Sequence, residues 1–243
     1  MLINIDIKGV EWVCIVWLSQ DKVGMREILE GVDQHGVNQK TFGLPDRRIA
    51  KIFVFRLIYG GSAWSYCFDP DFNWISKSPV YWQNVIDRFY DKYKGINQQH
   101  DLWVQTAIGT GQLVMPTGRT YIFEPIKLSE GGFKWPRTKV LNYPVQGLAA
   151  DIASIVRVSL RKRIRKIIND CTIKFVSTVH DSIILDCDLG EKVQPTLDAI
   201  KSVVDDVFRD IPDNFYKLFN IRFNLPLSCE IKYGNNLLDM QPI

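Results

Sequence analysis

The sequence predicts an α+β fold in which an antiparallel sheet is interrupted by a mostly helical insertion. Residues 2–7 alternate apolar and polar side chains near the start of the chain, and a strand-like segment at 226–233 lies near its end. Most of the chain between them has helical periodicity, apart from two predicted strands at 172–179 and 182–188. We therefore expect strands from both ends to share one sheet, while the helical middle forms a separate lobe.

The first part of the insertion is predicted to be largely helical. The apolar run at 10–18 indicates a buried helix and 22–31 a short amphipathic one, whereas 31–43 is polar and expected to be irregular. Leu44-Pro45-Asp46 then opens a strong helix, with Pro in the first turn and Asp46 at the positive end of the helix dipole. Gly60-Gly61 ends this helix.

Helices, turns and loops alternate in the rest of the chain. The expected elements are a loop at 69–79, helices at 79–94 and 97–110, a hairpin at 112–124, a loop at 129–136, and helices at 137–168 and 191–209. Pro116-Thr117-Gly118 is assigned to the hairpin turn because these residue types favour turns. The sequence has no internal repeat and no low-complexity linker.

Composition indicates a folded protein with a mild positive charge. The chain has 243 residues, of which 46% are hydrophobic and 23% charged, so it can bury one large core or two lobes that share one. A net charge of +3 is compatible with a polyanionic partner but does not require one. The basic run at 161–166 fits a solvated helix face and a phosphate-backbone contact equally well.

The cysteines and the hydropathy pattern indicate a cytoplasmic protein. The five cysteines are odd in number and contain no CxxC pair, which favours buried thiols in a reducing compartment over disulfides or a zinc site. No apolar run reaches the roughly 18 residues that span a bilayer, and the first residues do not resemble a signal peptide. We expect no contact with a membrane.

Two aspartates are predicted to lie at strand ends. Asp6 is near the end of the first predicted strand, and Asp181 lies in the turn between the strands at 172–179 and 182–188. Phosphoryl transfer with two magnesium ions needs carboxylates that bridge ions about 3.5–4 Å apart. Mg²⁺ takes few protein ligands and keeps waters and phosphate oxygens, so two aspartates suffice. Taken singly, each is more often an ordinary turn acid, because an aspartate at a strand end is common.

One helix carries cations and aromatic rings at a spacing of four residues. Arg47, Lys51, Phe55 and Tyr59 therefore lie along one slowly drifting helix face. A nucleoside triphosphate has the same order of charged tail, sugar and base, so this face would match phosphates to the cations, sugar to Phe55 and base to Tyr59. The alternative is an amphipathic helix with core aromatics and a solvated basic end.

Three segments, in this order, resemble motifs A, B and C of the family A DNA polymerases. They are IDIKGVEWVCIVWLSQD (5–21), DRRIAKIFVFRLIYGGS (46–62) and STVHDSIILD (177–186). The closing segment SCEIKYGNN (228–236) also resembles that family, and the likeness covers nearly the whole chain. It implies a DNA-directed DNA polymerase, a nucleotidyltransferase, with the palm and fingers of a right-hand fold.

The resemblance also assigns catalytic and triphosphate-binding residues. Asp6 and Asp181 would hold two Mg²⁺ ions, with the backbone carbonyl of Ile7 as a further ligand. Arg47 and Lys51 would bind the triphosphate of the incoming dNTP, and Lys51 would protonate the leaving pyrophosphate. GVDQHG (31–36) is similar to the family's acid-x-His segment, so His35 would reach the triphosphate as well.

Selection of the sugar is implied for three residues. By resemblance, Glu11 packs near Tyr59 and blocks a ribose 2′-hydroxyl, which favours deoxynucleotides. A buried glutamate paired with a tyrosine is also a plausible structural pair. Phenylalanine at position 55 implies discrimination against dideoxynucleotides, which Phe55→Tyr should relax.

Contacts with the DNA primer-template are implied elsewhere in the chain. NYPVQGLAADI (142–152) resembles the helix start that contacts DNA in this family, so Asn142 and Gln146 would face the minor groove. His180, and Arg119 in the predicted hairpin, are also expected to contact DNA. Thr138 stands where a DNA-contacting arginine is common, and Arg137 or Lys139 is the expected substitute.

Two departures from the family pattern bear on the site. Arg56 stands where the family usually has glycine, and it would contact DNA or alter closing of the fingers. Ser182 replaces the acid that commonly follows His-Asp. His-Asp-Ser also occurs in single-subunit RNA polymerases, which leaves a ribonucleotide-using polymerase or primase-like transferase as an alternative. A non-catalytic DNA-binding remnant is the second alternative.

The resemblance implies a discontinuous domain order. The palm would comprise 1–32 and 139–243, with an antiparallel sheet backed by helices, and the fingers would comprise 33–138. The family's thumb and exonuclease have no counterpart in this sequence. The chain is therefore either one half of a split polymerase or a fragment. We expect the first, of phage type, with a second polypeptide that carries those domains.

Overall fold

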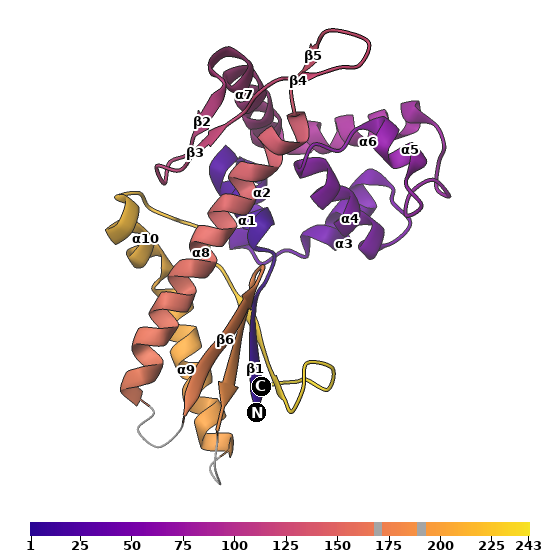
Figure 1. Ribbon diagram of the computed structural model, residues 1–243. Coiled ribbons are helices and arrows are strands. Elements are labelled where there is room, and N and C mark those ends of the chain that lie inside the picture. Colours follow the sequence, from indigo (N-terminus) through magenta and orange to yellow (C-terminus); the bar gives the residue numbers. More distant parts are fainter. Residues whose placement is uncertain (168–171, 189–192) are drawn as a thin grey trace. The chain divides into compact units, whose positions relative to one another are not determined.

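The computed structural model of the chain, shown in Figure 1, describes residues 1–167, 172–188 and 193–243. The chain forms two compact units. We call Met1–Glu11 with Gly147–Ile243 the sheet unit, and Trp12–Gln146 the helical unit. This architecture of helices with antiparallel sheets confirms the predicted α+β class.

The sheet unit is built on a five-stranded sheet with the order β6-β7-β1-β8-β9. Its strands are β1 (Leu2–Ile7), β6 (Ile173–Val179), β7 (Ser182–Cys187), β8 (Cys229–Gly234) and β9 (Gln241–Pro242). All neighbouring strands are antiparallel, and β1 pairs with both β7 and β8. The expectation that strands from both ends of the chain share one sheet is therefore confirmed.

One face of this sheet is packed by helices. Ile3, Ile5 and Ile7 alternate with less buried residues along β1 and are fully buried, as the period of two in a strand requires. The helices that belong wholly or partly to this unit are α8 (Arg137–Ile167), α9 (Val193–Arg209) and α10 (Ile211–Phe219). In Figure 1, α9 and the later part of α8 run alongside the sheet. On α8, buried residues recur every four positions, as at Ile152 and Val156.

The helical unit contains seven helices among its described residues, followed by two short hairpins. They are α1 (Val10–Ser19), α2 (Lys22–Leu29), α3 (Gln34–Phe42), α4 (Arg47–Ile58), α5 (Ala63–Phe68), α6 (Pro79–Lys92) and α7 (Lys94–Thr110). The hairpins pair β2 (Gln112–Val114) with β3 (Thr120–Ile122), and β4 (Ile126–Lys127) with β5 (Phe133–Lys134). The helix α1 begins in the sheet unit, and α8 runs from the helical unit into the sheet unit.

An aromatic core fixes α4 within the helical unit. Phe53 of α4 is fully buried and lies 5.0 Å from the ring of Tyr66 and 6.3 Å from that of Trp82. The Tyr66 hydroxyl also donates to the Phe53 carbonyl at 3.0 Å. Aromatic side chains bury large areas and pack best in such offset or edge contacts, so the face of α4 opposite its cations is held firmly.

Four expectations about elements were wrong. The polar stretch 31–43 was expected to be irregular but contains α3. The helix was missed because it buries polar side chains such as Asn38 and so shows no apolar period. The helix expected from Leu44 begins at Arg47, since Asp46 is its N-cap and accepts from the amide of Ile49 at 2.8 Å.

Two short helices, α5 and α10, were not predicted, and the expected loop at 129–136 contains β5. A Ser62/Ser65 capping box marks the start of α5, and this pair of serines is the sequence signal from which the helix could have been predicted. The last residue of the helix expected at 137–168 and the first two of that at 191–209 lie outside the described residues.

Candidate active site

Strand register brings Asp6 and Asp181 to the same end of the sheet. Asp6 lies opposite Ser182 in the antiparallel pair of β1 and β7. The amide of the next residue in β1, Ile7, donates to the carbonyl of Asp181 at 3.1 Å. Both aspartates are half-buried. Backbone hydrogen bonds therefore place the two residues on neighbouring strands, although they are far apart in the sequence.

A tight turn presents His180 beside this site. Val179 pairs with Ser182, so His180 and Asp181 form a two-residue hairpin turn. His180 is exposed and has a φ of 55°, in the left-handed region that non-glycine residues seldom adopt. Such backbone strain persists where the surrounding structure enforces it, and it is common at functional sites.

The face of the sheet that carries Asp6 also carries a hydroxyl group and an ion pair. The Ser182 hydroxyl donates to Oδ1 of Asp6. On the other side of β1, Glu230 lies opposite Asp6 and forms a 2.7 Å ion pair with Lys232. The hydrogen bond from Lys232 lowers the pKa of Glu230. Neither Ser182 nor Glu230 was predicted to act here.

The donor set suits a hard cation with few protein ligands. Within residues 1–167, 172–188 and 193–243, no group of three His, Cys, Asp or Glu side chains gathers in a metal-binding arrangement. Asp6 and Asp181 supply carboxylate oxygens, which Mg²⁺ prefers, and Mg²⁺ completes its shell with water and substrate oxygens. Two carboxylates at one strand end are the ligand type of a hard divalent cation that completes its shell with water.

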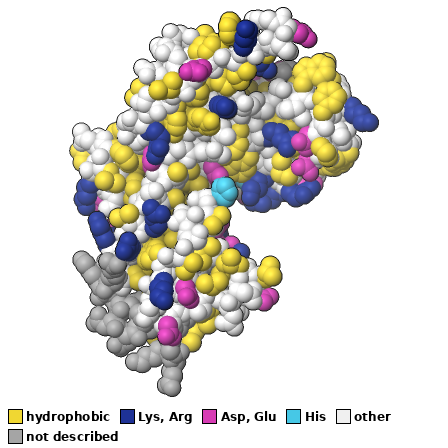
Figure 2. All heavy atoms as spheres, in the orientation of Figure 1, with side chains coloured by type: hydrophobic (Ala, Val, Ile, Leu, Met, Phe, Trp, Pro, Cys, Tyr) yellow, Lys and Arg dark blue, Asp and Glu magenta, His cyan; other side chains and the backbone are white. Residues whose placement is uncertain are grey.

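In the helical unit, the predicted face of α4 exists. Arg47 and Lys51 are exposed near its N-terminus, Phe55 is half-buried further along, and Tyr59 directly follows the last turn. Figure 2 shows Lys and Arg side chains gathered over α3 and α4. The positive end of the helix dipole adds to their potential, so this end of α4 attracts anions.

Arg47 is held by a carboxylate that the sequence analysis did not single out. Its Nη2 lies 2.8 Å from Oδ1 of Asp33, and its Nε donates to Oδ2 at 2.9 Å. This bidentate hydrogen bonding from Arg47 lowers the pKa of Asp33. Asp33 lies within the GVDQHG segment, so the acid of the acid-x-His pattern was the signal that could have found it.

His35 lies between these cations and an aromatic ring. Its ring centroid is 5.9 Å from that of Phe55, and Nδ1 is buried without a hydrogen-bond partner among the described residues. Burial, and then the charges of Arg47 and Lys51, lower the pKa of His35 to about 4. The ring is therefore neutral at pH 7 and adds no charge of its own to this group of cations.

A cavity of about 1200 Å³ lies along α4 within the helical unit. Phe55 and Tyr59 belong to its wall. Its described lining has one carboxylate, Asp69, and these cations: Arg48, Lys51, Arg56, Lys134, Arg137 and Lys139. This excess of positive charge favours an anionic occupant.

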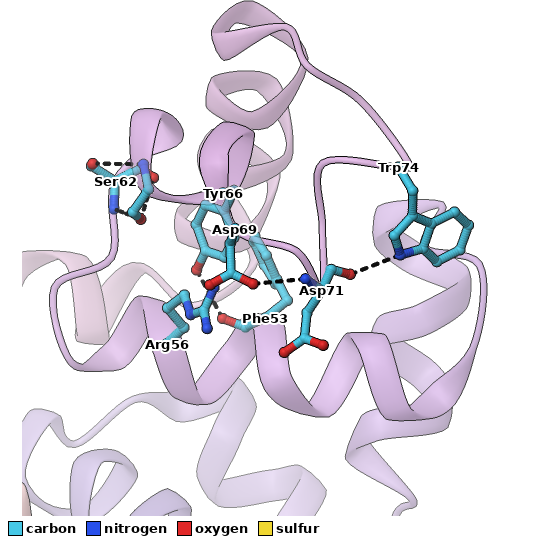
Figure 3. Close-up of polar contacts among 8 residues, drawn as sticks. Phe53, Arg56, Ser62, Tyr66, Asp69, Asp71 and Trp74 are labelled. Atoms are coloured by element: carbon cyan, nitrogen blue, oxygen red, sulfur yellow. Dashed lines mark hydrogen bonds and ion pairs between the residues drawn. The ribbon is translucent and has the colours of Figure 1, made fainter.

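Arg56 has a partner inside the protein. It forms an ion pair with Asp69 (Figure 3). Its guanidinium also lies 5.0 Å from the ring centroid of Phe72. Asp69 also accepts from the amide of Asp71 at 2.8 Å. Arg56 therefore ties α4 to the segment that follows α5.

The residues expected to contact DNA occupy several places in the chain. Asn142 and Gln146 both lie on α8, and Gln146 is exposed. Arg137 is exposed at the start of α8 and hydrogen-bonds Tyr90, and Arg119 is exposed in the β2–β3 hairpin. These four residues lie in the helical unit, whereas His180 lies in the sheet unit.

Glu11 lies in the first turn of α1 and is half-buried. It belongs to the sheet unit, whereas Tyr59 belongs to the helical unit. Their approach to each other, and the sugar selection it implies, stay predictions.

A sheet with aspartates at adjacent strand ends and a helical unit with a cationic helix are the features expected of a polymerase. The family model for DNA polymerase family A matches residues 1–239, and the chain belongs to this family. The resemblance drawn from the three motifs is thereby confirmed.

Curated relatives are similar along most of this chain. DNA polymerase I of Chloroflexus aurantiacus is 23% identical over 98% of the chain and 24% of its own length. DNA polymerase I of Lactococcus lactis subsp. lactis is 27% identical over 84% of the chain and 23% of its own length. The chain thus spans about a quarter of the length of these relatives.

A solved structure has the same fold. The POL domain of Pol1 from M. smegmatis, in complex with DNA primer-template and dNTP, aligns with a TM-score of 0.68 at 19% identity. The alignment covers 97% of this chain and 39% of that one. This likeness supports the polymerase fold.

No helix among the described residues is both long and apolar enough to cross a membrane.

Proposed function

We propose that this chain is the catalytic part of a template-directed DNA polymerase that adds dNTPs to a primer 3′-hydroxyl. Membership of DNA polymerase family A supports the reaction class. The observation that carries the proposal is the pairing of β1 with β7, which brings Asp6 and Asp181 to one end of the sheet. DNA binding alone would not require two acids beside a phosphate.

Asp6 and Asp181 hold the divalent cations in this proposal, with the carbonyl of Ile7 as a further ligand. When bound, a pair of Mg²⁺ ions activates the attacking hydroxyl and neutralises the leaving pyrophosphate. The chain's own part is to hold the two acids close together, and the backbone hydrogen bond between Ile7 and Asp181 fixes their strand ends before substrate arrives.

The exposed cations of α4 bind the triphosphate. Arg47 and Lys51 contact its oxygens, and Lys51 donates a proton to the departing pyrophosphate. His35, neutral because its pKa is lowered to about 4, donates or accepts a hydrogen bond there. Phe55 then lies against the sugar and Tyr59 against the nascent base pair.

Selection of the sugar and grip on DNA involve the remaining predicted residues. Glu11 excludes a ribose 2′-hydroxyl. Asn142 and Gln146 on α8 contact the primer-template, and His180, Arg119 and Arg137 contribute further contacts. In this scheme the palm comprises residues 1–32 and 139–243, and the fingers comprise 33–138.

Primer extension with and without each acid tests the proposal. Asp6→Asn and Asp181→Asn each remove charge with little change of shape, and both should reduce incorporation of dNTP to near background. Asp186→Asn is the matched control, because Asp186 is an exposed acid of β7 at the opposite end of that strand. Near-normal extension by either site variant would refute the assignment.

A ribonucleotide-using polymerase or primase-like transferase is the second candidate, favoured by the His-Asp-Ser sequence at 180–182. Competition between dNTP and rNTP decides between them. We expect the wild-type chain to prefer dNTP and Glu11→Ala to lose that preference. A wild-type preference for rNTP would favour the second candidate, and unchanged selectivity in Glu11→Ala would refute the sugar-selection role.

We also propose that this chain works together with thumb and exonuclease domains, and that the source is a phage whose polymerase works in the host cytoplasm. The family resemblance supports this, as does the match to about a quarter of the length of DNA polymerase I relatives. Purification of the tagged protein from its native source, followed by mass spectrometry, should reveal those domains, either in the same polypeptide or in a companion. An active protein recovered with those domains in neither place would contradict it.

A further inference from the structure

We propose that Ser182 is a positioning residue for Asp6, which presents the Asp6 carboxylate to a divalent cation. This inference rests on the proposed function. Ser182 and Asp6 are direct partners in the β1–β7 ladder, so their side chains point to the same face of the sheet. The Ser182 hydroxyl donates to Oδ1 of Asp6.

The direction of this hydrogen bond follows from the chemistry of the two groups. An ionised carboxylate can only accept, so the hydroxyl must donate. Because the acceptor is charged, the bond is shorter and stronger than one between neutral groups. The hydrogen bond from Ser182 occupies Oδ1 of Asp6 and leaves Oδ2 available. The carboxylate is therefore held in one rotamer, with Oδ2 directed to the cation.

The surrounding backbone makes the arrangement rigid. Ser182 begins β7, and the chain that leads into it is fixed by the Asp181–Ile7 hydrogen bond and by pairing of Val179 with Ser182. Both partners therefore start from ordered positions, and little conformational entropy is lost when the side chains meet. Such outer-shell hydrogen bonds orient metal ligands in proteins generally.

The neighbouring charged group on this face is engaged elsewhere. Glu230 lies opposite Asp6 on β8, but its carboxylate is in the 2.7 Å ion pair with Lys232. An acid at position 182 would instead place a second negative charge against Asp6. Serine at position 182 donates a hydrogen bond to Asp6 and does not repel it. The site then has one negative charge fewer than it would with an acid at this position.

The test compares two β-branched variants that differ in one group. Ser182→Thr keeps the hydroxyl, whereas Ser182→Val replaces it with a methyl group of similar size, and both suit a strand. Binding of Mn²⁺ to the full chain is titrated by electron paramagnetic resonance in the absence of DNA and nucleotide. We expect Ser182→Val to weaken Mn²⁺ binding about tenfold, and Ser182→Thr to bind like wild type.

A third variant separates failure of this inference from failure of the proposed function. If Asp6→Asn binds Mn²⁺ as tightly as wild type, the cation site itself is wrong. If Asp6→Asn loses binding while Val and Thr at position 182 behave alike, only the role of Ser182 is overturned. Thermal unfolding monitors the fold of each variant, and Ser182→Ala replaces Ser182→Val if the valine variant is unfolded.

Discussion

The acids of the sheet unit and the cation Arg47 of the helical unit are positioned by different means. Asp6 and Asp181 are half-buried, and backbone hydrogen bonds between strands set their places. Arg47 is exposed, and a side-chain ion pair with Asp33, also exposed, sets its orientation. The acids are therefore fixed by the fold, whereas the cation is held by a contact that an incoming anion can share or replace.

This difference predicts how the acids and the cation respond to change. A surface ion pair contributes about 0–1 kcal/mol to stability, so rearranging the Arg47–Asp33 pair is inexpensive. Moving a strand end requires breaking several ladder hydrogen bonds at about 1 kcal/mol each. We expect acid substitutions to abolish the reaction, and substitutions around Arg47 to alter nucleotide affinity in graded steps.

The largest graded effect is expected for Arg47 itself. Arg47→Ala removes a guanidinium that stabilises phosphate charge, and loss of one such donor typically lowers kcat by about 10²–10³. The measurement is steady-state dNTP incorporation, with Lys40→Ala as the control because Lys40 is an exposed cation of neighbouring α3. Equal rates in the two variants would show that α4 does not bind the triphosphate.

Acid should destabilise the helical unit through His100. Burial lowers the pKa of His100 to about 3, so the unfolded chain binds a proton between pH 6.5 and 3 that the folded chain does not. Stability is therefore complete above pH 6.5 and falls as the pH drops through this window, by about 2 kcal/mol at pH 5.

Urea unfolding of wild type and His100→Gln at pH 7 and pH 5 measures this effect. The wild-type free energy of unfolding should fall between the two values of pH, and that of the variant should fall less. An identical fall in both proteins would mean that His100 is not the acid-sensitive group.

The Arg56–Asp69 pair should matter for stability more than an exposed pair. Both side chains are largely buried, with exposed fractions of 29% and 23%, and Arg56 also covers Phe72. Arg56→Ala leaves Asp69 without this partner and should lower the free energy of unfolding by about 1–2 kcal/mol. Urea denaturation measures it, with Arg88→Ala as an exposed control. A loss no greater than that of the control would place Arg56 among ordinary surface residues.

Replacing His180 in the hairpin turn should have a smaller effect, with a gain in stability and a loss in primer extension. His180→Gly relieves a left-handed backbone and should stabilise the protein by up to about 1 kcal/mol. If His180 also contacts the primer-template, the same variant should extend primers more slowly. Faster or unchanged extension would remove His180 from the DNA-binding residues.

The smallest effect is expected at Asp33. Asp33→Asn removes the anion that competes with the triphosphate for Arg47, so KM for dNTP should fall by up to about fivefold with kcat unchanged. A rise in KM would instead show that Asp33 orients Arg47 for binding, and would weaken the contrast between the acids and Arg47.

Sequence patterns could predict elements whose signals are local. The alternation in residues 2–7 predicted β1, and Asp46 with Gly60-Gly61 bounded α4 to within a few residues. The helix α3 was missed because it buries Gln34 and Asn38, which give no apolar period. Local periodicity cannot reveal a helix whose buried face is polar.

Side-chain contacts between distant residues were beyond such patterns. The Ser182–Asp6 hydrogen bond depends on the register of β1 against β7, which no spacing in the sequence specifies. The Arg47–Asp33 and Arg56–Asp69 pairs depend on how loops return the chain to α4. Motif order predicted which residues form the site, but it could not show which contacts hold them.

The central claim is that Asp6 and Asp181 act as one cation-binding unit. Single-turnover incorporation of one dNTP by Asp6→Asn, Asp181→Asn and the double variant tests it directly. Residues that act as a unit show non-additive losses, so each single variant should be about as slow as the double variant. Losses that multiply in the double variant, or a single variant that stays near the wild-type rate, would contradict the account.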